Sequence, residues 1–135
     1  MELIKRLSCV GLVLCVAAGC GETSLLPAPP TATALRLDFQ TPRSDDGALV
    51  LTVQGPELSS LQAASPAYLV YSRPATADRV RIVVIGDLKG GSLVTMSMAP
   101  GHQRSEYSVT IDQIASRTDE LRADLSGYQV NITAP

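Results

Sequence analysis

The chain has 135 residues, with 11 Lys and Arg against 13 Asp and Glu, and a formal net charge of −2. This balance supplies no basic field for nucleic acid, and the length leaves room for one domain rather than two. Apolar residues make up 45% of the sequence, but it holds one Phe and no Trp, so a core must be filled mainly by aliphatic side chains.

Residues 1–19 have the build of a secretory signal peptide. Lys5 and Arg6 precede an uncharged run over residues 7–18 that ends in small side chains. The run is too short for a permanent membrane span, which needs about 20 helical residues. We therefore expect export followed by cleavage.

The four residues Ala17-Ala18-Gly19-Cys20 resemble the lipobox of bacterial lipoproteins, although Ala17 stands where Leu is commonest. The resemblance implies diacylglyceryl attachment to Cys20, cleavage between Gly19 and Cys20, and acylation of the new amine by a fatty acid such as palmitate. Each buried CH₂ contributes about 0.8 kcal/mol, so two or three acyl chains would hold the protein to a membrane. The alternative is an ordinary signal peptide with chance cysteines.

Residues 20–34 follow as a Pro-, Ala- and Thr-rich stretch without an apolar period, which predicts an extended tether. By the same resemblance, Gly21 lacks the Asp that retains some lipoproteins at an inner membrane. We therefore expect the outer membrane in a bacterium with two membranes, and otherwise the plasma membrane.

Cleavage would also change the charge and the thiol content. Removing Lys5, Arg6 and Glu2 from the totals leaves 9 basic and 12 acidic residues. Cys9 and Cys15 would be lost too, so no disulfide could form within the mature chain and packing alone would stabilise the domain.

Seven stretches in residues 35–135 predict β-strands, because apolar residues alternate or cluster between Gly, Pro and Asp turns. They are residues 35–39, 48–54, 68–72, 79–88, 93–98, 107–111 and 127–133. The apolar run 82–85 predicts a central strand covered on both faces, and Pro74 is expected to end the third strand. The segment 87–91, "DLKGG", predicts a tight hairpin to the next strand.

Two segments lack a strand pattern. Residues 56–65 are compatible with one helical turn, and residues 114–125 with a short helix or an irregular crossover. The predicted fold class is therefore all-β, an antiparallel two-sheet β-sandwich of about seven strands with little helix, either immunoglobulin-like or cohesin-like. Its predicted core contains Leu37, Phe39, Leu49, Leu51, Val53, Leu69, Ile82, Val84, Leu93, Met96, Val109, Ile111, Leu121, Val130 and Ile132.

The strand order and the segment 83–98, "VVIGDLKGGSLVTMSM", are similar to cohesin-like sandwiches, in which a central strand ends in a Gly turn and a hairpin partner returns. The resemblance implies a fold and no dockerin-binding residue. The chain also looks like the small single-domain lipoproteins of bacteria.

Candidate catalytic residues are few. His102 lies in a turn-like segment near Ser105 and Glu106, where a solvated loop residue is the simpler interpretation. An enzyme would need distant polar residues such as Asp38 and Asp87 to converge on His102. We expect no enzyme, no catalytic residue and no cofactor.

Four aspartates raise the possibility of a Ca²⁺ site: Asp45, Asp46, Asp87 and Asp112. The D-x-D-x-D-G spacing is missing, and Asp-Asp-Gly is ordinary turn chemistry, so we favour a structural turn and expect no metal.

The tyrosines Tyr68, Tyr71, Tyr107 and Tyr128 could form an aromatic platform for a sugar, although half-buried packing is the simpler interpretation. The leading hypothesis is a non-enzymatic, membrane-anchored module that binds an envelope protein or polysaccharide through end loops or by strand addition, with no nucleic acid partner. The alternative is a carbohydrate-binding module that uses surface tyrosines.

Overall fold

The computed structural model describes residues 33–135 of the chain. The predicted leader over residues 1–19, the cleavage position at Gly19 and the lipidation site at Cys20 lie outside the described residues. The same holds for most of the predicted tether, whose last two residues, Thr33 and Ala34, already belong to the first strand.

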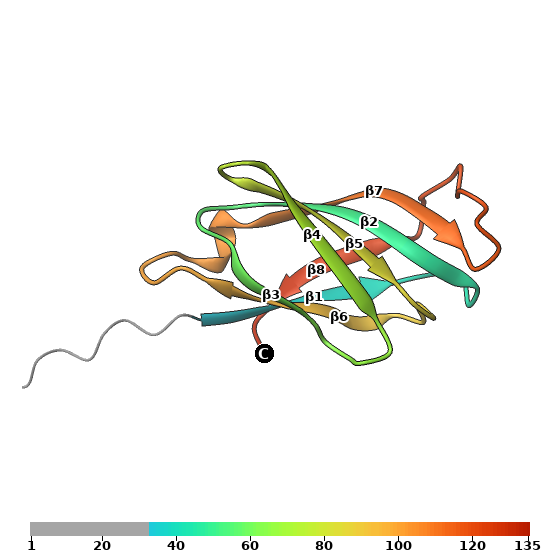
Figure 1. Ribbon diagram of the computed structural model, residues 1–135, viewed down its shortest axis with the longest axis horizontal. Helices are drawn as coiled ribbons and strands as arrows, with labels where there is room; N and C mark the ends of the chain where they lie inside the picture. Colours follow the sequence, from blue (N-terminus) through green and yellow to red (C-terminus); the bar gives the residue numbers. More distant parts are fainter. Residues whose placement is uncertain (1–32) are drawn as a thin grey trace, which may run out of the picture.

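Eight β-strands form two four-stranded sheets (Figure 1). They are β1 (Thr33–Gln40), β2 (Asp46–Gln54), β3 (Ser59–Ala63), β4 (Leu69–Thr76), β5 (Arg79–Ile85), β6 (Gly91–Met98), β7 (Ser108–Ser116) and β8 (Gln129–Thr133). The sheets have the orders β3-β6-β1-β8 and β4-β5-β2-β7, and all neighbouring strands are antiparallel. The prediction of an all-β two-sheet sandwich is confirmed, with eight strands in place of seven.

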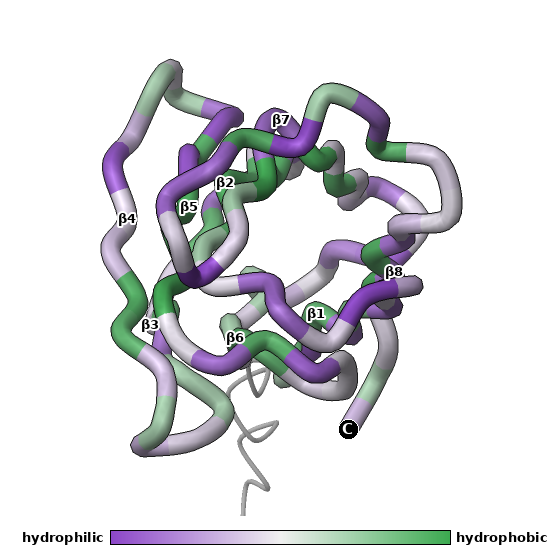
Figure 2. Tube along the Cα trace, turned by 90° about the vertical axis from the view of Figure 1, so that its right-hand side faces the viewer, coloured by the Kyte–Doolittle hydropathy of each residue, from purple (hydrophilic) through white to green (hydrophobic). Residues whose placement is uncertain are grey.

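Alternation of apolar and polar residues decides which side of each sheet faces inward. In β1, Leu35, Leu37 and Phe39 are buried, whereas Arg36 and Asp38 between them are only half-buried on the outer face. Figure 2, which looks along the long axis, shows the two sheets as separate layers. Between these layers lies the core.

The most deeply buried side chains come from both sheets and from one connection between them. They are Leu35, Leu37, Phe39, Leu49, Leu51, Val53, Ile82, Val84, Leu88, Leu93, Val94, Met96 and Ile114. Three predicted core residues, Val109, Ile111 and Val130, are only partly buried. The core assignment of Leu69 and Leu121 is wrong: Leu69 faces outward beside Ile85, and Leu121 is 68% exposed in the loop after β7.

The predicted hairpin at residues 87–91 is wrong, because β5 and β6 belong to different sheets. Strand β5 ends at Ile85, and the connection then crosses the edge of the core, where Leu88 is fully buried. The backbone N–H of Leu88 donates to the carbonyl of Asp46 at 3.0 Å, which fixes the crossing. The segment is therefore a crossover between the sheets, held by the buried Leu88, and not the hairpin that its glycines predicted. The hairpin on which the cohesin-like resemblance partly rested is missing.

Strand β3 occupies the segment for which a helical turn was predicted. It pairs with the edge of β6, with Gln62 opposite Thr95 and a register shift between Ser59 and Gln62. Ser60 has φ of 52°, an unusual backbone conformation within a strand. Pairing to a free edge, which satisfies backbone groups, prevailed over the weak three-residue apolar spacing.

Strand β4 passes through Pro74 to Thr76 instead of ending before the proline. A proline is tolerated there because β4 is an edge strand, and the register shifts between Pro74 and Thr76. Strand β5 was predicted to be covered on both faces, and this is wrong. Arg81 and Ile85 are exposed on the outer face of its sheet.

Strand β7 extends to Ser116, and the residues that follow form an irregular loop, which is the second of the two predicted alternatives for residues 114–125. Within the described chain, the 3-10 turn η1 (Arg104–Glu106) is the only helical element. Arg36 of β1 pairs with Thr133 of β8, so the first strand begins and the last strand ends at the same end of the sandwich. The β7–β8 loop lies at the opposite end (Figure 1).

Candidate functional site

A groove runs along one side of the sandwich between β7 and β8. Each of these strands is the edge of its own sheet: β7 pairs with β2, and β8 pairs with β1. The two strands are not paired with each other, so each keeps an edge without a ladder partner. The exception is the end of β7, where Ala115 forms an isolated bridge with Leu121. We call this feature the β7–β8 groove.

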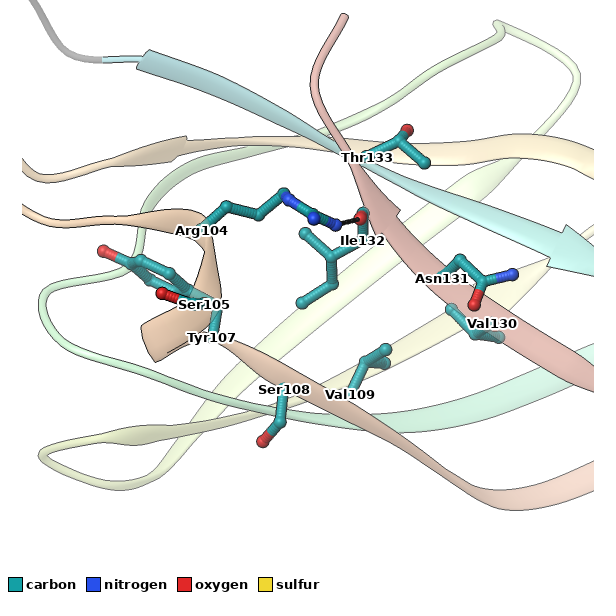
Figure 3. Close-up of a pocket in the computed structure, with 9 residues that line it drawn as sticks. All are labelled: Arg104, Ser105, Tyr107, Ser108, Val109, Val130, Asn131, Ile132 and Thr133. Carbon is teal, nitrogen blue, oxygen red and sulfur yellow. Dashed lines mark hydrogen bonds between the residues drawn. The ribbon is translucent and has the colours of Figure 1, made fainter.

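The part of the groove nearest η1 has a volume of about 530 Å³ (Figure 3). Side chains from both strands and from η1 line it: Arg104, Ser105, Tyr107, Ser108, Val109, Val130, Asn131, Ile132 and Thr133. In Figure 3 the side chains of Val109 and Ile132 lie between the two strands, whereas Ser108 points away from β8. The floor is therefore apolar and the rims are polar.

A second part, of about 440 Å³, continues toward the far end of the sandwich. It shares Val109, Val130 and Asn131 with the first part, which makes the two parts continuous. Ile111 and Leu125 add further half-buried apolar surface. The groove is thus an elongated channel with apolar side chains along its floor and polar side chains around them, a shape that suits an extended chain.

The backbone of β8 presents hydrogen-bonding groups to the groove. Nη1 of Arg104 donates to the carbonyl oxygen of Ile132 at 2.7 Å, so this carbonyl points away from β1. In a strand, residues two apart direct their N–H and C=O groups to the same side. Val130 therefore also faces the groove with its backbone N–H and C=O.

Five side chains fix the far end of the groove through a polar cluster. Asp46 is fully buried at the start of β2 and accepts hydrogen bonds from Thr41, from Nε of Arg122 at 3.1 Å and from the Tyr128 hydroxyl at 3.1 Å. The Arg122 guanidinium is 12% exposed and also bonds Asp45 at 2.7 Å. This cluster ties the β7–β8 loop to the start of β2 and so positions Tyr128 in the groove wall.

Ionisation within this cluster follows from its contacts. The hydrogen bond from Arg122 lowers the pKa of Asp45, and the bond to Asp45 in turn raises the pKa of Arg122. Burial raises the pKa of Tyr128, and the adjacent Asp46 carboxylate raises it further. The cluster is an internal ion pair with its hydrogen-bond partners in place, which is a structural role.

The candidate catalytic residues do not converge. His102 Nδ1 lies 2.8 Å from Oε2 of Glu106, near η1, and this bond lowers the pKa of Glu106. Glu106 also accepts from the backbone N–H of Gln103 at 2.8 Å, which makes it a capping group of η1. Asp38 instead accepts a bond from Thr133 on the outer face of the other sheet, and Asp87 lies in the β5–β6 connection.

The candidate Ca²⁺ ligands are also dispersed, and each faces a cationic side chain. Asp87 pairs with Lys89 at 2.8 Å and with Arg117 at 3.3 Å, while Asp112 lies 3.5 Å from Arg81. Within residues 33–135, no three His, Cys, Asp or Glu side chains gather as a metal site would need.

The four tyrosines do not lie side by side on an exposed face. Tyr107 and Tyr128 are only 6% and 7% exposed, and Tyr68 packs against the core. Tyr107 donates its hydroxyl to the carbonyl of Pro56 at 2.8 Å, and Tyr128 stacks on Phe39 with ring centroids 6.1 Å apart. Tyr71 alone of the four is well exposed, on the outer face of β4.

Sequence reasoning missed the two arginines that organise the groove, Arg104 and Arg122. Neither lies in a periodic segment, and each finds its partner far along the chain, at Ile132 and Asp46. No sequence signal pointed to either arginine. Asp46, the partner of Arg122, follows turn residues and was therefore interpreted as part of a turn, whereas it is buried.

The fold is a two-sheet β-sandwich with a groove between the edge strands β7 and β8. Comparisons with protein-family models, with curated proteins and with solved structures find no match to this chain. In the part of the chain that the structure describes, no helix has the length and apolar character to cross a membrane.

Proposed function

We propose that this protein is a non-enzymatic binding module that is held at the bacterial cell envelope by lipid on Cys20 and captures an extended segment of a partner protein. The observation that carries the binding part is the β7–β8 groove, in which two unpaired strand edges flank an apolar floor. Addition of a strand to a sheet edge is a common means of peptide recognition. No chemical step is assigned to the site.

Two kinds of contact would hold a captured segment: hydrogen bonds between backbone groups, and apolar contacts between side chains. A segment laid in the groove would bond backbone groups such as those of Val130, and every second side chain would cover Val109, Ile111 or Leu125. Such half-buried side chains gain free energy when more of their surface leaves water, at about 25 cal/mol per Å².

A protein segment suits this groove better than a polysaccharide does. Sugar binding commonly uses an exposed ring face, and the two rings that line the groove, Tyr107 and Tyr128, are almost fully buried. Tyr71 is exposed, but it lies on β4, outside the groove lining.

The binding part is tested by crosslinking from within the groove. A photoreactive phenylalanine analogue replaces Asn131 or Gln129, which both line the groove, and as a matched control Tyr71, which is 59% exposed outside the groove. We expect crosslinks from positions 131 and 129, but not from 71, to one short segment of the partner. Equal crosslinking from position 71, or crosslinks scattered over the partner surface, would contradict capture in the groove.

The anchoring part rests on the lipobox at Cys20 and has its own test. Mass spectrometry of the protein from native membranes should show a mature N-terminus at Cys20 carrying fatty acids, and the protein should partition into detergent. Cys20→Ala should move it to the aqueous phase, whereas the matched Cys15→Ala should not. A mature N-terminus elsewhere would overturn the anchor and leave the groove hypothesis intact.

A further inference from the structure

Arg104 closes one end of the β7–β8 groove. It belongs to η1, directly before β7, yet its side chain crosses to β8 and bonds the carbonyl of Ile132 at 2.7 Å (Figure 3). The guanidinium thus spans the two strands at this end. An extended chain that fills the groove would meet this side chain at its end.

Arg104 also sets the charge of the groove. Among all residues that line either part of the groove, Arg104 is the only one with a formal charge. None of the described carboxylates forms an ion pair with it. Glu106, two residues further on, is engaged by His102 and by the N–H of Gln103.

The guanidinium keeps donors for an anion. It carries five N–H donors, and the bond to Ile132 uses one of them. Arginine binds a carboxylate strongly because its fork of donors matches the two oxygens. A positively charged chain end would be repelled at the same place.

From this arrangement we propose that the groove receives the C-terminal end of a partner chain, with its terminal carboxylate on Arg104. The inference rests on the proposed function and specifies its ligand. An end fits because Arg104 blocks a continuing chain, and the carboxylate end fits because of the positive charge. With its C-terminus at η1, the segment runs parallel to β8 and antiparallel to β7.

The test compares two peptide pools on the full chain in detergent micelles. Both contain peptides of about six residues that alternate Val, Leu or Ile with Ser or Thr, a length of about 20 Å. One pool has free C-terminal carboxylates and the other has C-terminal amides. Affinity is measured by fluorescence polarisation, and the site by NMR shifts of Val109 and Val130.

We expect the free-acid pool to bind at least about tenfold more tightly than the amide pool, as loss of a charge-assisted bond implies. Arg104→Gln should remove this difference, Arg104→Lys should keep part of it, and the matched surface variant Arg73→Gln should leave it unchanged. NMR spectra of the backbone amide groups of each variant would establish that the fold persists.

The other outcomes separate this inference from the proposed function. Equal binding of both pools in the groove would overturn C-terminal recognition and leave strand capture standing. The same holds if amide peptides with an internal Asp bind as tightly as free acids. If neither pool shifts Val109 or Val130, strand capture fails together with the inference.

Discussion

The hydroxyl of Tyr128 donates a hydrogen bond of 3.1 Å to Oδ1 of Asp46, which joins residues 82 positions apart and links the residue before β8 to the start of β2. Tyr128→Phe removes this donor and leaves a fully buried carboxylate with one partner fewer. We expect the free energy of unfolding to fall by about 1.5–3 kcal/mol, measured by urea denaturation.

Tyr71→Phe is the matched control, because Tyr71 is exposed and lies outside this cluster. Its unfolding free energy should stay within about 0.5 kcal/mol of the parent value. Equal losses in the two variants would show that the bond to Asp46 adds no stability.

Gly55 leaves room for the ring of Tyr107, and a larger residue would collide with it. A Cβ at position 55 would lie 2.7 Å from Cε1 of Tyr107, whose hydroxyl is fixed on Pro56. We expect Gly55→Ala to cost about 1–3 kcal/mol in thermal or urea unfolding. The cost should shrink in a Tyr107→Leu background, and an unchanged cost there would place its origin elsewhere.

Two leucines in neighbouring loops should respond in opposite ways to truncation. Leu88 is fully buried in the β5–β6 connection, so Leu88→Ala should cost about 2–5 kcal/mol in urea unfolding. Leu121 is mostly exposed, and Leu121→Ala should change the unfolding free energy by no more than about 0.5 kcal/mol. A larger loss for Leu121 than for Leu88 would contradict the described packing.

Stability should fall in acid because several carboxyl groups have lowered pKa values in the folded state. Lys89 lowers the pKa of Asp87 from 3.8, and His102 lowers that of Glu106 from 4.5. Each group contributes stability above its unfolded pKa, and this is lost as pH falls through the lower folded value. Unfolding midpoints should therefore decline below about pH 4.5.

His102→Ala tests the Glu106 part of this dependence. The variant removes the largest cause of the lowered pKa of Glu106, so its stability should decline less between about pH 4.5 and 3. An unchanged slope in urea unfolding at several pH values would rule out a role for this pair.

The strand periods in the sequence were sufficient to predict the class of fold. Leu35, Leu37 and Phe39 alternate with polar residues, and β2 repeats the pattern with Leu49, Leu51 and Val53, so both inner faces could be recognised. Strand pairing was less accessible, because it depends on which distant edge is free. The Gly-rich segment after Ile85 is compatible with a hairpin as well as with a crossover, and burial of Leu88 decided between them.

The groove could be predicted only in outline. Val109, Ile111 and Val130 were recognised as inward-facing, but their partial exposure results from the lack of pairing between β7 and β8. Arg104 and Arg122 act across long sequence separations, and no local pattern distinguishes them from other surface arginines.

The pairing of Arg36 with Thr133 makes neighbours of the first and last described strands. A short glycine-rich bridge from Thr133 to Thr33 should therefore close the domain into a ring, which could be reopened in the exposed turn between β4 and β5. We expect such a circular permutant to keep the parent circular dichroism spectrum. Formation of the sandwich would then depend on which strands pair, and not on their order along the chain.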